Sequence, residues 1–109
     1  MSENSNQELA TMTLIAHSGD ARSLAFKALE FAKEGNFSEA EEYLKKSDEE
    51  SKLAHQGQTE LLVEEANGGK HEFNLLLVHA QDHLMTSMLA VELIREIIQL
   101  RQEISEKQS

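Results

Sequence analysis

The chain has 109 residues, and 20 Asp and Glu against 10 Lys and Arg give it a net charge of −10. This length suits one domain, and the acidic surplus argues against nucleic acid or an anionic membrane surface as a partner. The absence of Cys excludes disulfides, thiolate zinc sites and cysteine nucleophiles, and it fits a reducing compartment. No apolar run reaches the roughly 20 residues of a membrane span, and the polar N-terminus does not resemble a signal peptide.

Glycine and proline usage predicts three long helices. The chain has no Pro, so no proline breaks or kinks a helix. Beyond the first few positions, turn residues cluster only at Gly35-Asn36 and at Asn67-Gly68-Gly69. No segment alternates with period 2, as a half-buried strand would. We therefore expect an all-α, antiparallel three-helix bundle over 1–109, with helices at about 6–34, 39–66 and 71–104.

The first two expected helices carry capping signals. Ser5 with Glu8 and Ser38 with Glu41 match the S-x-x-E capping box, which opens a helix just after the serine. The first helix has small and apolar residues at helical spacing, and the second is acidic, with nine Asp and Glu against three Lys over 36–67. The expected inward stripe of the first helix is Ala10, Leu14, His17, Ala21, Leu24 and Ala28.

The third expected helix has two apolar faces. One stripe continues for four heptads at spacings of 3 and 4, and a second stripe lies on another side. Two partner helices cover less surface than this helix offers, so we expect it to be central and its surplus face to pack against other copies of the chain. A monomeric bundle with a wide core is the alternative. The two stripes are Leu76, His79, His83, Thr86, Ala90, Leu93, Ile97, Leu100 and Ile104, and Leu77, Leu84, Met88, Val91 and Ile98.

Three ionisable residues interrupt the apolar pattern of this helix. His79, Asp82 and His83 lie at i, i+3 and i+4, which places them on one face. Burying such groups costs several kcal/mol unless they are paired or hydrogen-bonded, so a functional role competes with a structural one. His17, on an apolar stripe, is as compatible with the core as with function. His55 and His71 have polar neighbours and are expected at the surface.

Three chemistries fit this patch. Imidazole and carboxylate one turn apart can ligate a divalent ion, although no Glu-x-x-His or H-E-x-x-H motif accompanies them. A histidine oriented by a carboxylate can act as a general base. A neutral imidazole can also attack phosphorus and hold the phosphoryl group on nitrogen. The residues by themselves leave metal binding and phosphoryl transfer open.

The string Leu77-Val-His-Ala-Gln-Asp-His-Leu-Met85 resembles the active-site segment of the lactose/cellobiose-type enzyme IIA of the bacterial sugar phosphotransferase system. Two more segments match, Ser18-Gly-Asp-Ala-Arg-Ser23 and Ala54-His-Gln-Gly-Gln-Thr59, and the similarity covers roughly 9–104. It is greatest to the cellobiose and diacetylchitobiose members. The resemblance implies one family domain, a homotrimer around the third helix and a cytoplasmic location.

The resemblance also assigns roles. His79 matches the phosphorylated histidine, which accepts a phosphoryl group from the carrier HPr and passes it to a cysteine of the IIB component. IIB then serves the membrane component IIC during uptake of a β-linked disaccharide. Asp82 matches an aspartate on the threefold axis, where the family binds a divalent cation, Mg²⁺, and His83 matches a supporting active-site histidine. A non-catalytic trimeric metal-binding bundle and a purely structural interaction module are the alternatives.

Overall fold

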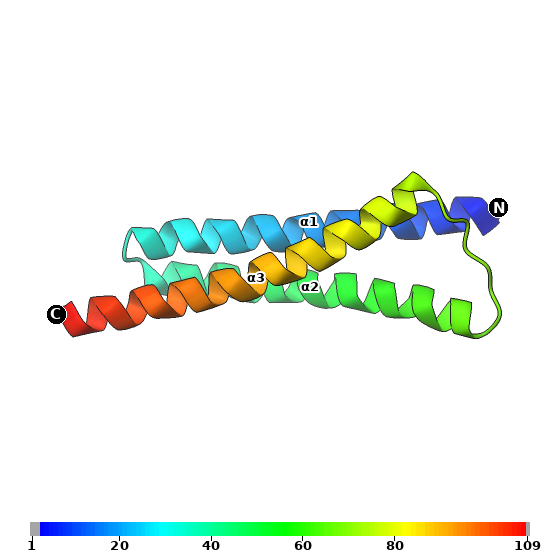
Figure 1. The fold of residues 1–109 in the computed structure, drawn as a ribbon. Coiled ribbons are helices and arrows are strands. Elements are labelled where there is room, and N and C mark those ends of the chain that lie inside the picture. The colour runs from blue at the N-terminus through cyan, green and yellow to red at the C-terminus, as the bar shows by residue number, and fades with distance from the viewer. Residues whose placement is uncertain (1–2, 109) are drawn as a thin grey trace.

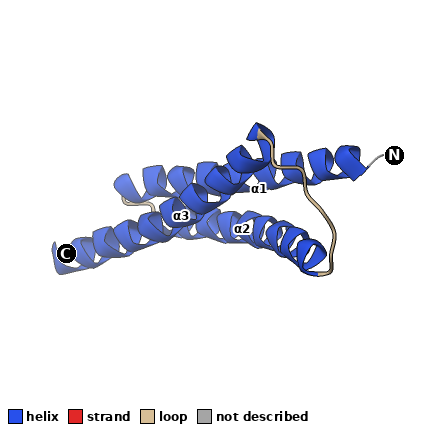
Figure 2. Cartoon of the chain, turned by 45° about the vertical axis from the view of Figure 1, so that its right-hand side comes forward, coloured by secondary structure: helices blue, strands red, loops and turns tan. Residues whose placement is uncertain are grey.

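The structure, a computed structural model, describes residues 3–108, with side chains from Asn6 onward. Three helices run up, down and up: α1 (Glu3–Lys33), α2 (Phe37–Ala66) and α3 (Leu75–Gln108) (Figure 1). The described residues contain no strand, as Figure 2 shows, and the bundle measures 60 × 21 × 20 Å. The expected all-α three-helix architecture is confirmed. No helix among these residues is both long and apolar enough to cross a membrane.

Glycine ends the first two helices, as the turn clusters predicted. Gly35 and Gly68 have positive φ angles of 82° and 94°, a conformation that glycine adopts without steric cost. After α1, the amides of Gly35 and Asn36 donate to the carbonyls of Ala32 and Phe31, and residues 68 and 69 repeat this pattern after α2. Both ends are thus Schellman caps, which satisfy carbonyls that the helix leaves without partners.

Asparagine begins the second and third helices, which corrects the expected starts. Asn36 caps α2, with its Oδ1 accepting from the Glu39 amide at 3.2 Å, so Ser38 lies inside the first turn and its predicted capping box is wrong. Asn74 caps α3 in the same way, with its Oδ1 2.9 Å from the Leu77 amide. α3 therefore begins later than the expected residue 71. α1 already begins at Glu3, and the side chain of Ser5 lies outside the described part.

Within the subunit, α1 is the central helix, which corrects the expectation for α3. α1 packs along both other helices, whereas α2 and α3 touch each other only briefly. Small side chains on α1 allow both neighbours to approach closely, since the separation of two helices depends on the side chains between them. The buried residues of α1 include polar ones that an apolar pattern overlooks: Thr11, Leu14, Ser18, Ala21, Ala25, Ala28 and Ala32.

The two apolar faces of α3 have different environments. The second predicted stripe forms the core of the subunit, where Leu84, Val91 and Ile98 are buried against α1 and α2. The C-terminal half of the first stripe is left uncovered. We call the following residues, which are 43–57% exposed, the outer stripe: Leu93, Ile97, Leu100 and Ile104.

Candidate functional site

The two histidines of the predicted patch contact each other on successive turns of α3. The imidazole rings of His79 and His83 meet edge to face, with centroids 4.7 Å apart and planes inclined at 78°. His79 is exposed, and no residue of the described chain hydrogen-bonds its ring. Its nitrogens are therefore open to a reactant from solvent. Among the described residues no carboxylate is hydrogen-bonded to His79, so the predicted partner that would orient it as a general base is not seen there.

His83 is half-buried and holds its ring with one nitrogen inside the bundle. The Nδ1 atom is buried and has no hydrogen-bond partner among the described residues. A buried ring nitrogen is out of reach of water and of a reactant in solvent. Nε2 is therefore the ring nitrogen of His83 that can exchange hydrogen bonds outside the bundle.

Asp82 lies apart from the two rings. Its side chain is exposed, it makes no ion pair in the described subunit, and its backbone carbonyl accepts a hydrogen bond from Thr86 Oγ1 at 2.7 Å. One turn before and after it are the exposed apolar side chains of Val78 and Met85. Asp82 is therefore a single carboxylate on an apolar surface. Over residues 3–108 no three His, Asp or Glu side chains form a group that could hold a metal ion.

The segment before α3 is anchored to α1 and α2. Gln7 of α1 and the backbone of Glu72 form a reciprocal pair, with Gln7 Nε2 donating to the Glu72 carbonyl and the Glu72 amide donating to Gln7 Oε1. The distances are 2.7 and 2.8 Å. His71 Nε2 donates to the Leu61 carbonyl of α2 at 3.0 Å. These bonds hold the N-terminal end of α3, which carries His79, against the bundle.

A second reciprocal pair joins α2 directly to the patch. The side-chain amides of Gln58 and Gln81 donate to each other's oxygens at 2.6 and 2.8 Å, and both are half-buried. Gln81 lies between His79 and His83 in the sequence but on the side of α3 that faces α2. Because α2 and α3 touch only briefly, this pair is a main link between them.

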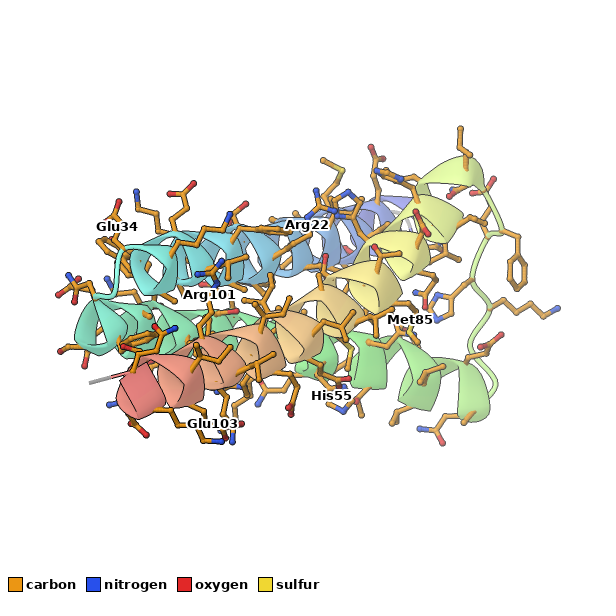
Figure 3. All side chains as sticks on the ribbon, turned by 60° about the vertical axis from the view of Figure 1, so that its left-hand side comes forward. Arg22, Glu34, His55, Met85, Arg101 and Glu103 are labelled. Carbon is orange, nitrogen blue, oxygen red and sulfur yellow. The ribbon has the colours of Figure 1, made fainter. Side chains whose placement is uncertain are left out.

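The remaining histidines have varied environments. His17 is half-buried, and its Nδ1 lies 2.6 Å from Glu50 Oε2 of α2, so it forms an interhelical pair at the edge of the core. His55 is exposed on α2, as expected (Figure 3). His71 is half-buried through its bond to Leu61 and is not the expected surface residue. None of these three is hydrogen-bonded to His79 or His83 or stacks against their rings.

Comparison with known families explains why these residues occur together. The family model described as "PTS system, Lactose/Cellobiose specific IIA subunit" matches residues 9–102, which include all of α2, most of α1 and α3, and the whole patch. The chain belongs to this IIA family. The resemblance seen in the sequence is thereby confirmed. This chain is therefore a IIA component, of the lactose/cellobiose type, of a sugar phosphotransferase system.

Three relatives illustrate the match. The N,N'-diacetylchitobiose-specific EIIA component of Escherichia coli K12 is 50% identical over 97 residues, which cover 89% of this chain and 84% of that protein. The crystal structure of a cellobiose-specific enzyme IIA from Bacillus anthracis has a TM-score of 0.90 at 44% identity, covering 98% and 95% of the two chains. A solution structure of a IIA(Chitobiose)–HPr complex has a TM-score of 0.79 at 46% identity, covering 91% and 96%.

Proposed function

We propose that this IIA component is a phosphocarrier that accepts a phosphoryl group on His79 from phosphorylated HPr and passes it to a cysteine of a IIB component. The observation that carries the proposal is the exposed, unbonded imidazole of His79 on a firmly anchored helix. The similarity to a IIA that was solved together with HPr supports HPr as the donor. The sugar is a β-linked disaccharide of the cellobiose, chitobiose or lactose type, and the protein acts in the cytoplasm.

Each transfer exchanges one bond to phosphorus for another. The lone pair of an imidazole nitrogen of His79 forms the new N–P bond while the N–P bond to the HPr histidine breaks, and that histidine keeps the bonding pair. In the second transfer a thiolate of IIB attacks, and His79 recovers its lone pair. Such transfers depend mainly on in-line positioning and on stabilising charge. The chain has no Cys, so the second acceptor must come from another protein.

His83 supports the reaction as a hydrogen-bond donor. Its ring contacts His79, and with Nδ1 buried, Nε2 is the ring nitrogen available to donate a hydrogen bond. An N–H on the neighbouring turn can donate to an oxygen of a phosphoryl group on His79, and hydrogen bonds to charged oxygens are stronger than neutral ones. This assigns His83 to charge stabilisation rather than to nucleophilic attack.

Asp82 belongs to an assembly of three chains in this proposal. In the described part of one subunit Asp82 is a single carboxylate, which is a poor site for a divalent cation. The outer stripe lies further along the uncovered side of α3 on which Asp82 lies. A homotrimer around α3 would bring three Asp82 carboxylates together, an all-oxygen donor set that suits Mg²⁺. Bound there, the cation would offset the repulsion between the carboxylates. It takes no part in the transfer steps.

Incubation with phosphorylated HPr tests the proposal. We expect an intact-mass increase of one acid-labile phosphate per chain, mapped to His79 by peptide analysis. His79→Ala should remove the label, and the exposed His55→Ala should retain it as the matched control. A protein that binds divalent metal but takes no label from phosphorylated HPr would instead be a non-catalytic metal-binding bundle. Uptake of the sugar with His79→Gln at the normal rate would indicate a structural module.

A further inference from the structure

Two buried serines do not follow the hydrogen-bonding pattern of the threonines in the bundle. A helical Ser or Thr commonly donates its hydroxyl to the carbonyl four residues earlier. Ser18 of α1 and Ser87 of α3 are each only 2% exposed, yet neither hydroxyl oxygen has a hydrogen-bond partner among the described residues. A buried hydroxyl without a partner costs stability, so it calls for an explanation. The residues whose hydroxyls do donate in this way are Thr11, Thr13, Thr59 and Thr86.

Ser87 lies one helical turn after His83, whose ring also has an unpartnered buried atom. The two residues are i and i+4 on α3, so their side chains are neighbours on one face. Ser87 Oγ and His83 Nδ1 are both buried, and both lack a hydrogen-bond partner within the described residues. A hydroxyl can donate, and a ring nitrogen without a proton can accept, so the two atoms are complementary. The third unpartnered buried atom of the described side chains, Ser18 Oγ, lies on a different helix.

A bond between these two atoms would select one tautomer of His83. A hydroxyl that donates to Nδ1 is compatible with a neutral ring only if that ring carries its proton on Nε2. Nε2 is the nitrogen that, in the proposed reaction, donates to an oxygen of the phosphoryl group on His79. Hydrogen bonds at the two nitrogens polarise the ring in the same direction and strengthen each other. The bond from Ser87 is therefore strongest while His83 donates to phosphate, and its two atoms can stay unpaired at other times.

We propose that Ser87 is a positioning residue for phosphoryl transfer, whose hydroxyl donates to Nδ1 of His83 and so holds the proton of that ring on Nε2. This inference rests on the proposed function, because Ser87 acts through the hydrogen bond from His83 to the phosphoryl group. Ser87 itself does not touch the reacting atoms. Its part in the reaction is a rotation between staggered rotamers, so no covalent bond forms or breaks there.

The kinetics of transfer from phosphorylated HPr test this role. We expect Ser87→Ala to lower the rate at saturating HPr roughly three- to tenfold, as the loss of one neutral hydrogen bond would, with the half-saturating HPr concentration unchanged. Ser18→Ala removes the other unpartnered hydroxyl, so it is the matched control and should transfer at the wild-type rate. In a His83→Ala background, Ser87→Ala should have no further effect, because Ser87 acts through His83. An equal loss in that background would overturn the inference.

Nitrogen-15 NMR observes the tautomer directly, because the chemical shift of a ring nitrogen shows whether it carries a proton. In the phosphorylated wild type we expect His83 to have its proton on Nε2 and none on Nδ1, and Ser18→Ala should match it. Ser87→Ala should give a mixture of the two tautomers. A wild-type ring protonated on Nδ1, or an unchanged tautomer in Ser87→Ala, would refute the inference while phosphoryl transfer to His79 stands. A wild-type protein that takes no label from phosphorylated HPr would refute the proposed function itself.

Discussion

The His79 and His83 rings lie edge to face on successive turns of α3, with centroids 4.7 Å apart. One ring is exposed and unbonded, and the other keeps a nitrogen buried without a partner. In the proposed reaction the pair would combine an accessible nucleophile, His79, with an adjacent hydrogen-bond donor, His83. Neither residue needs a carboxylate for this arrangement, and the described subunit provides none in contact with them.

Removing the donor should slow phosphoryl transfer without abolishing it. We expect His83→Ala to lower the rate of transfer from phosphorylated HPr roughly ten- to a hundredfold, because a hydrogen bond to a charged group contributes about 1.5–3 kcal/mol. His83→Gln retains an N–H donor and should recover part of the loss. Rapid-quench kinetics would measure both, with His55→Ala as the control. A wild-type rate for His83→Ala would remove His83 from the reaction.

Replacing Asp82 with an apolar residue should strengthen self-association. Asp82 is a carboxylate between Val78 and Met85 on the uncovered side of α3. If three copies converge there, Asp82→Leu exchanges charge repulsion for apolar contact. We expect sedimentation to give a dissociation constant at least tenfold lower, and one that no longer responds to Mg²⁺ or EDTA. Asp20→Leu, at an exposed position of α1, is the control. Dissociation to monomers would place Asp82 outside the interface.

The amide pair between Gln58 and Gln81 should contribute to folding stability. Gln58→Ala removes both hydrogen bonds of this pair, and at about 0.5–1.5 kcal/mol each the free energy of unfolding should fall by roughly 1–2 kcal/mol. Urea denaturation would measure it. With Gln81→Ala, a double-mutant cycle should give a coupling above about 0.5 kcal/mol. The exposed neighbour Gln56→Ala should change little. Additive effects of the two substitutions would show that the pair does not form.

Two buried serines should respond to alanine in opposite ways. Ser47 Oγ donates to the Ala21 carbonyl at 2.7 Å, so Ser47→Ala should lower the free energy of unfolding by about 1 kcal/mol. Ser87 is equally buried, but its Oγ has no hydrogen-bond partner among the described residues. Ser87→Ala removes an uncompensated hydroxyl and should leave stability unchanged or raise it by about 1 kcal/mol. A loss at Ser87 similar to that at Ser47 would reveal a partner for its hydroxyl.

Local signals in the sequence predicted the helix ends unevenly. Gly35 and Gly68 were identified because a positive φ is a requirement of a single residue. The caps Asn36 and Asn74 were missed because several residues near each start can accept an amide hydrogen bond, and packing decides which one does. For the same reason Ser38 was given a role that Asn36 fulfils.

The candidate site divides in the same way. The spacing of His79 and His83 was sufficient to place them on one face, because positions i and i+4 are neighbours on any helix. Their different exposure, the buried Nδ1 of His83 and the bond between Gln81 and Gln58 depend on which side of α3 faces α1 and α2. The rotation of α3 about its own axis, relative to α1 and α2, is set by how the three helices pack together. The sequence of α3 has two apolar faces, so its apolar pattern does not show which face points inward.

By itself the sequence determined that this acidic chain forms three long helices, through its lack of Pro, its two glycine turns and its long apolar periodicities. The string at residues 77–85 also indicated the family, which the family model then confirmed. These are local properties, carried by backbone preferences and by helical spacing. Only the tertiary structure decided that α1 is the shared helix and that one stripe of α3 stays uncovered. The physical reason is that small side chains on α1 let both α2 and α3 approach it closely. Which helix is shared, and which stripe stays uncovered, depends on how the surfaces of all three helices fit together.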